Sequence, residues 1–170
     1  LSDELLQKSP FELSGGQKRR VAIAGVLAME PKILVLDEPA AGLDPEGRDT
    51  ILTQIKNYHQ ATGITVILVS HSMEDIARYA NRVLVMDHGK VAMYDTVEAV
   101  FARAPELLRL GLSVPQVTQA FLMLTGMGLD IDTDVYTMPY AVKTVLRAWN
   151  AKHPDKAVPV GKKGGGADAS

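Results

Sequence analysis

The apolar positions of this 170-residue chain follow two periods, one typical of strands and one typical of helices. Short apolar runs without a polar side predict strands that are buried on both faces of a parallel sheet. Longer segments with apolar residues three and four positions apart predict helices between them. This alternation predicts an α/β layer domain. In chain order we expect a helix at 17–29, a strand at 33–36, a helix at 45–62, a strand at 64–69, a helix at 72–79 and strands at 83–86 and 91–94.

Local signals at the helix ends support this assignment. Ser14-x-x-Gln17 is a capping box, in which each side chain can bond an amide of the first turn. Asp44 and Pro45 supply an N-cap and a proline at the first helical position, and Gly63 can end that helix. The helix at 17–29 is apolar almost all round, which predicts burial on most of its sides.

After Tyr94 the pattern changes to a series of short helices. We expect helices through 97–110, after Pro115 and after Pro139, the last two with apolar stripes that they cannot bury alone. The stripes can complete the monomer's own core or form an interface with a second subunit, and the pattern leaves both open. The residues in register are Val117, Phe121 and Leu124, then Val142, Val145, Leu146 and Trp149. We therefore expect a domain part at 1–95, a helical appendage at 96–151 and a flexible tail at 152–170, to which we assign no function.

Composition narrows the class of protein. Lys and Arg number 18 against 20 Asp and Glu, so the net charge of −2 gives no strong field for nucleic acid or an anionic membrane. The absence of cysteine excludes a disulfide framework and is compatible with the cytosol. Apolar runs fall short of the roughly 20 residues that a spanning helix needs. The first four residues have neither the basic start nor the apolar stretch of a signal peptide.

Four short motifs carry glycine, carboxylate and histidine side chains in a fixed order. They are Leu13-Ser14-Gly15-Gly16-Gln17, an apolar strand followed by Asp37-Glu38-Pro39, Ala41-Gly42-Leu43-Asp44, and Val69-Ser70-His71. In this order they resemble the signature, Walker B, D-loop and switch histidine of ABC transporter ATPases over residues 9–95. The resemblance implies an ABC-type P-loop ATPase domain, in its C-terminal part, with a small helical appendage.

The phosphate-binding Gly-x-x-x-x-Gly-Lys-Ser/Thr loop of such ATPases does not occur in the 170 residues. We therefore expect the isolated chain to be an incomplete fragment that does not hydrolyse ATP by itself, whereas the full-length protein is expected to be an ATPase.

Each motif matches one need of phosphoryl transfer to water. Asp37 follows a buried strand, where open α/β sheets place ligands, and should hold Mg²⁺. Glu38 is the candidate general base, and His71, after the next buried strand, can position water or the γ-phosphate. The resemblance implies that the signature binds the γ-phosphate of ATP held by an opposite subunit, through Ser14, Gly15, Gly16 and Gln17, and that Asp44 contacts the dimer interface.

The sequence of the helical appendage indicates which class of ABC ATPases the chain resembles most. The run 111–118, then Gly126-x-Gly128 and the segment 132–135, is similar to the C-terminal region of energy-coupling-factor ATPases, which drive uptake of vitamins or transition-metal ions. This similarity implies a second ATPase subunit, as a homodimer or heterodimer, together with a membrane coupling protein and a substrate-binding membrane subunit. It also implies a peripheral location on the cytoplasmic face of the membrane.

Two other classes share some of these features. The ATPase heads of DNA-maintenance proteins share the signature and Walker B motifs, but they carry long heptads and basic surfaces that this sequence lacks. The basic triplet at 18–20 has no interleaved aromatic residues, so we interpret it as a solvated helix face and expect no nucleic acid partner. The remaining histidines lack partners at zinc-ligand spacing. A non-enzymatic interaction fragment is the other alternative.

Overall fold

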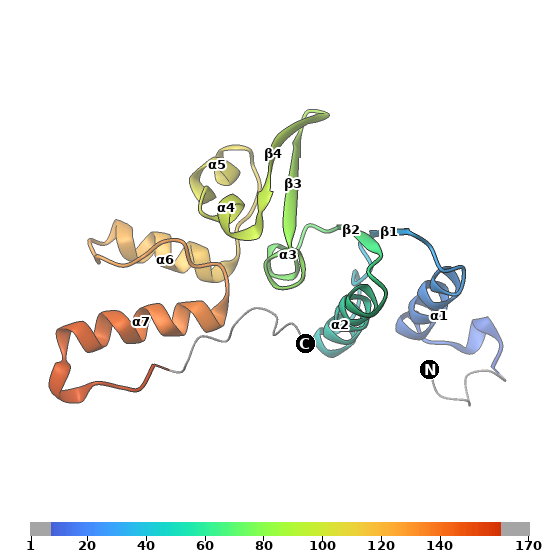
Figure 1. Cartoon of the computed structure of the whole chain (residues 1–170), viewed down its shortest axis with the longest axis horizontal. Coiled ribbons are helices and arrows are strands. Elements are labelled where there is room, and N and C mark those ends of the chain that lie inside the picture. Colours follow the sequence, from blue (N-terminus) through green and yellow to red (C-terminus); the bar gives the residue numbers. More distant parts are fainter. Residues whose placement is uncertain (1–7, 161–170) are drawn as a thin grey trace. The chain divides into compact units, whose positions relative to one another are not determined.

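A computed structural model describes residues 8–160, which divide into two compact units, one ending at His71 and one starting at Ser72. Each unit is described by itself. The first contains η2 (Pro10–Glu12), α1 (Gly15–Leu27), β1 (Ile33–Asp37), α2 (Pro45–Thr62) and β2 (Thr65–Val69). The second contains α3 (Met73–Tyr79), β3 (Arg82–Asp87), β4 (Lys90–Thr96), α4 (Val97–Phe101), α5 (Ala104–Arg109), α6 (Gln116–Gly126), α7 (Met138–Lys152) and η3 (Pro154–Lys156) (Figure 1).

In the first unit β1 and β2 form a parallel pair, as the sequence predicts. Their register sets Val35 beside Ile67 and Asp37 beside Val69. Parallel strands carry their carboxyl ends to the same edge, so the segments that follow Asp37 and Val69 leave the sheet side by side. This edge is where the predicted carboxylates and the histidine emerge.

The prediction that these strands are buried on both faces is wrong for the described residues. Leu34 is 2% exposed, whereas its neighbour Val35 is 62% exposed, and this alternation runs along β1. Ile67 and Val69 in β2 are exposed in the same way. A strand is buried on both faces only when elements cover both, and the two helices of this unit leave one face of the pair open to solvent.

Helix α1 forms as its capping box predicts, but it is not buried. Ser14 Oγ accepts a hydrogen bond from the Gln17 amide at 3.2 Å, and Gln17 Oε1 accepts one from the Ser14 amide at 2.9 Å. No residue of the helix is buried, and Val21 and Val26 are exposed. The physical reason is that apolar residues spread all round a helix need neighbours on every side, and this unit has too few elements to supply them.

The caps of α2 match the sequence prediction. Asp44 Oδ1 accepts a hydrogen bond from the Gly47 amide at 3.2 Å, Pro45 occupies the first position, and Gly63 ends the helix with a φ of 70°. Asp44 is therefore an N-cap, which was one of its two predicted roles. The buried residues of α2 are Ile51, Leu52 and Ile55.

The second unit is built on an antiparallel hairpin. β3 and β4 are joined through His88 and Gly89, which have φ values of 46° and 75°, as a tight hairpin turn requires. Val83 and Val85 of β3 pack into one apolar cluster with Phe101 and Leu107 of the short helices. Partly buried residues of α3 pack against the same cluster, so this hairpin, α3, α4 and α5 share a core.

Helices α6 and α7 form a smaller cluster of their own. Phe121 of α6 and Ala141 of α7 are both buried there, with Val135 of the connecting segment. The buried hydroxyl of Thr118 donates to the Val135 carbonyl at 2.6 Å, which ties that segment to α6. Beside this cluster the two helices border a hollow of about 460 Å³. Its lining is almost entirely apolar, and Val142 and Val145 are among the residues that line it.

The predicted tail at 152–170 lies partly outside the described residues. In the described part of the tail, the Asn150 side-chain amide donates to the Val158 carbonyl at 2.8 Å, and the Val158 amide donates to Asn150 Oδ1 at 2.8 Å. This pair joins the segment after α7 back to the helix. The division of the chain at 95 and 151 stays a prediction.

One contact in the second unit predicts a pH effect. The Tyr136 hydroxyl donates to Glu98 at 2.9 Å and its ring stacks on Phe101. Burial and this hydrogen bond raise the pKa of Tyr136 to about 12. Because the folded pKa lies above the unfolded value of 10, the stabilisation is complete below pH 10 and is lost as pH rises through about 12. Thermal unfolding should therefore show a smaller loss of stability between pH 10 and 12 in Tyr136→Phe than in the wild type.

Candidate functional site

The carboxyl ends of β1 and β2 bring Glu38 and His71 together. The Glu38 amide donates to the Val69 carbonyl at 2.9 Å, which extends the parallel ladder by one bond beyond the strand. Glu38 Oε1 accepts from the His71 amide at 2.9 Å and lies 2.7 Å from His71 Nδ1. Residues 33 positions apart in sequence are thus joined by two bonds to one carboxylate oxygen.

Glu38 stands in an uncommon backbone conformation. Its φ of 46° lies in the left-handed region, which few residues other than glycine adopt. Such conformations persist where the surroundings impose them, and they cluster at active sites. Here the hydrogen bonds to Val69 and His71 supply that constraint. The position of the Glu38 carboxylate is therefore set by its contacts at the sheet edge.

This arrangement defines which atoms are available for chemistry. An ionised carboxylate can only accept, so the proton shared with His71 belongs to Nδ1. Both bonds use Oε1, and Oε2 can accept a proton from water without breaking either of them. The imidazole is 85% exposed and the Glu38 side chain 32% exposed, so a substrate can reach both. The pair can therefore orient and deprotonate a water molecule.

Asp37 ends β1 next to Glu38 and is exposed at the same edge. Within residues 8–160 no three His, Cys, Asp or Glu side chains gather as a preformed metal cage. Mg²⁺ does not need one, since it is usually held by one or two carboxylates, waters and the phosphates of its substrate. A single exposed Asp at the sheet edge fits that mode of binding.

The signature segment forms the start of α1. Its capping box uses the side chains of Ser14 and Gln17, and a Cβ built on Gly15 meets nothing within 4 Å. The first amides of an α-helix have no partner within the helix, and its dipole favours an anion there. An anion can thus approach the backbone at Gly15 closely. The side-chain oxygen of Gln17 is engaged in the cap. The predicted role of Gln17 in phosphate binding stays a prediction.

The segment from Glu38 to Asp44, called the 38–44 loop below, is held by backbone hydrogen bonds between residues three positions apart. The Ala41 amide donates to the Glu38 carbonyl at 3.1 Å and the Leu43 amide to the Ala40 carbonyl at 3.3 Å. Gly42 has a φ of 73°, which a side chain would oppose. The loop therefore connects the Glu38 carboxylate to the α2 cap through two consecutive turns.

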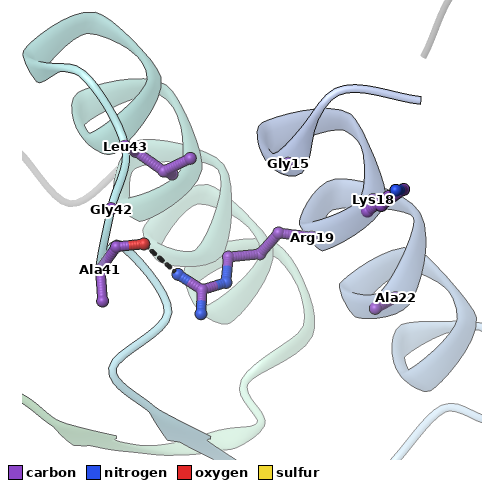
Figure 2. A pocket seen from close by; sticks show the side chains of 7 residues that line it. All are labelled: Gly15, Lys18, Arg19, Ala22, Ala41, Gly42 and Leu43. Atoms are coloured by element: carbon purple, nitrogen blue, oxygen red, sulfur yellow. Dashed lines mark hydrogen bonds between the residues drawn. The ribbon is translucent and has the colours of Figure 1, made fainter. Parts of the chain in front are cut away.

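Two residues near these motifs have contacts that the sequence did not predict. Gly47 was given no role, and Arg19 was interpreted, within the basic triplet at 18–20, as part of a solvated helix face. A Cβ on Gly47 would lie 2.6 Å from Asp44 Oδ1, so a side chain there would displace the Asp44 carboxylate from its present position in the cap. Arg19 donates from Nη1 to the Ala41 carbonyl at 2.6 Å, across an open hollow of about 440 Å³ (Figure 2). The position of Gly47, three residues after the N-cap Asp44, is a signal that the sequence offers. Nothing in the sequence indicates the hydrogen bond from Arg19 to Ala41.

The structure thus brings Glu38 and His71 into contact and leaves Asp37 beside them. It places Gly16 against the 38–44 loop, because a Cβ on Gly16 would lie 3.3 Å from Leu43 Cδ2. The predicted roles of these residues toward ATP and Mg²⁺ remain predictions.

Comparisons with known proteins identify relatives of this chain. The family model described as ABC transporter matches residues 1–41. The energy-coupling factor transporter ATP-binding protein EcfA2 of Caldanaerobacter subterraneus subsp. tengcongensis is 54% identical over 86% of this chain and 51% of its own length. The protein of the same name from Clostridium perfringens is 52% identical over 82% of this chain and 49% of its own. The chain spans about half the length of the curated relatives it matches.

Solved structures give the same result. CbiO1 from Clostridium perfringens, described as part of the ABC transporter complex cbiONQ, is 42% identical with a TM-score of 0.55, over 64% of this chain and 43% of that one. A dimeric post-hydrolysis state of the ATP-binding cassette MJ0796, bound to ADP and Pi, is 31% identical with a TM-score of 0.52, over 57% and 41%. The predicted α/β fold of an ABC ATPase, in partial form, is confirmed. The chain is therefore a homologue of the EcfA2-type ATP-binding proteins of energy-coupling factor transporters.

Proposed function

We propose that the full-length protein containing this chain is the ATP-binding and hydrolysing subunit of an energy-coupling-factor importer of vitamins or transition-metal ions. The observation that carries this proposal is the pair of hydrogen bonds from His71 to Glu38 at the edge of the parallel strands. The homology to EcfA2 proteins supports the class of transporter.

In the proposed reaction Glu38 acts as the general base. Oε2 accepts a proton from the attacking water while Oε1 stays bonded to His71. The imidazole holds the carboxylate in position through Nδ1. Its Nε2 would donate to the γ-phosphate only in the imidazolium, in which both ring nitrogens carry a proton. Asp37 would hold Mg²⁺, which supplies neutralisation of the charge on the transferred phosphoryl group. Rigid placement of the base matters because most of the catalysis in phosphoryl transfer comes from positioning and electrostatics.

The signature segment would complete the site of a second subunit. Ser14, Gly15, Gly16 and Gln17 stand at the start of a 13-residue helix, whose amides and dipole suit the γ-phosphate of ATP bound by the opposite subunit. Asp44, besides capping α2, would lie at the interface between the two. A site shared in this way closes only when two ATPase subunits meet.

The other partners follow from the class of transporter. They are a membrane coupling protein and a substrate-binding membrane subunit, with the ATPase bound at the cytoplasmic face of the membrane. Within residues 8–160 the helices are too short or too polar to traverse a bilayer. The test is release of inorganic phosphate from Mg-ATP by the full-length protein assembled with its partners, and absence of release would contradict the proposal.

A related prediction concerns the 170 residues by themselves. We expect calorimetry to detect no binding of Mg-ATP at micromolar concentrations, because the signature forms one side of a two-sided site and the chain has no Gly-x-x-x-x-Gly-Lys-Ser/Thr loop. The full-length protein is the control and should bind. Micromolar affinity of the 170-residue chain would show that it contains a phosphate site that these motifs do not explain.

A further inference from the structure

Arg19 connects two motifs that are far apart in the sequence. It is the fifth residue of α1, one turn beyond the signature glycines. Figure 2 shows its guanidinium extending from α1 toward the 38–44 loop, where Nη1 donates to the Ala41 carbonyl at 2.6 Å. A charged donor makes a stronger hydrogen bond than a neutral one. The contact is therefore a specific link between the signature helix and the loop.

A second, apolar contact lies beside this link. A Cβ on Gly16 would lie 3.3 Å from Leu43 Cδ2, so the helix and the loop approach closely at two points. The amides of Ala41 and Leu43 are used by turns within the loop, whereas the Ala41 carbonyl is turned outward to Arg19. The loop geometry that orients this carbonyl depends on Gly42 with its φ of 73°. The loop thus presents an acceptor that Arg19 uses.

We propose that Arg19 is a positioning residue that holds the signature segment in register with the 38–44 loop, and through it with Glu38. The bonded carbonyl is three residues after Glu38 and three before Asp44, and the first turn of the loop is closed onto the Glu38 carbonyl itself. Arg19 does not act on ATP. It fixes the signature amides relative to the loop that starts at the base, so that both act in one assembled dimer. This inference rests on the proposed function.

Lys18 provides a matched control. It is adjacent in the same helix, it borders the same hollow, and Figure 2 shows it directed away from Ala41. Lys18→Met removes the same charge as Arg19→Met but leaves the link in place. Arg19→Lys keeps a donor that can bond a single carbonyl, since this contact does not need the two-pronged geometry of arginine.

The experiment uses the full-length protein assembled with its partners. We expect Arg19→Met to lower kcat for Mg-ATP about tenfold with KM unchanged. This is the effect expected when one charge-assisted hydrogen bond that stabilises the transition state is lost. Arg19→Lys should recover most of the turnover, and Lys18→Met should match the wild type. Amide hydrogen exchange in peptides covering 39–44 should be faster in Arg19→Met alone, with an unchanged melting temperature.

The two readouts separate this inference from the proposed function. Exchange in 39–44 measures the link whether or not ATP is hydrolysed, and an exchange rate equal to that of the wild type would overturn it. Unchanged kcat in Arg19→Met, or an equal loss in Lys18→Met, would overturn its role in turnover. Absence of phosphate release by the wild type would instead contradict the proposed function, and wild-type turnover in Glu38→Gln would exclude Glu38 as the base.

Discussion

Replacing Glu38 by Gln should lower kcat for Mg-ATP hydrolysis by the full-length protein roughly 10²- to 10⁴-fold, the usual contribution of a general base. Gln keeps the shape of the side chain, and its Oε1 can still accept from the His71 amide and from Nδ1, which lie 2.9 and 2.7 Å away. What it loses is the ability to take a proton from water. Steady-state phosphate release and equilibrium nucleotide binding measure the two properties separately, and binding should be preserved.

A matched control is Glu46→Gln in the first turn of α2. Glu46 is exposed and close in sequence, so this variant removes a charge of the same kind away from the sheet edge. It should hydrolyse ATP at the rate of the wild type. Turnover of Glu38→Gln at the wild-type rate would exclude Glu38 as the base, and a loss of nucleotide binding would mean that the carboxylate is needed for affinity instead.

Much of the fold could be predicted because local chemistry decides it. The cap formed by Asp44 and the turn at Gly63 define α2 to within its observed bounds, Pro45–Thr62. The capping box at Ser14 likewise fixes the start of α1. Burial could not be predicted in the same way, since it depends on what else is present. The apolar character of Val35 and Val21 indicates that they can be covered, but not that any element of this unit covers them.

In the candidate site, too, some features follow from local sequence and others depend on how distant segments pack. Glu38 and His71 were identified as separate motifs after strands that the sequence predicts to be buried, and the parallel register that joins those strands brings them together. Arg19 was interpreted with its neighbours as part of a solvated helix face. Its bond to Ala41 depends on how α1 faces a loop 22 positions away, and no periodicity or spacing encodes that orientation.

The second large effect concerns helices α6 and α7. The sequence left open whether their apolar stripes serve the monomer or an interface, and the structure separates residues of the stripes that are buried in the monomer from residues that stay exposed. Phe121 is 4% exposed in the cluster with Ala141, so it belongs to the core of its own unit. Val145 is 48% exposed and borders the apolar hollow between the two helices. Only residues of the second kind can be shared with another subunit.

We therefore expect Phe121→Asp to act on folding. Loss of a buried phenylalanine costs about 3–5 kcal/mol, and a buried carboxylate adds to that cost. Thermal unfolding of the full-length protein should show a lower melting temperature or loss of the cooperative transition of this unit. A melting temperature equal to that of the wild type would show that Phe121 is not part of the core.

Val145→Asp should instead leave the melting temperature of the monomer nearly unchanged and weaken association of the two ATPase subunits. Burial of a valine side chain contributes about 1.5–3 kcal/mol, so its replacement by a charged residue should raise the dissociation constant at least tenfold if the second subunit covers it. Sedimentation of the full-length protein measures this, with Lys143→Asp on another side of α7 as the control. Unchanged association of Val145→Asp would exclude Val145 from the interface.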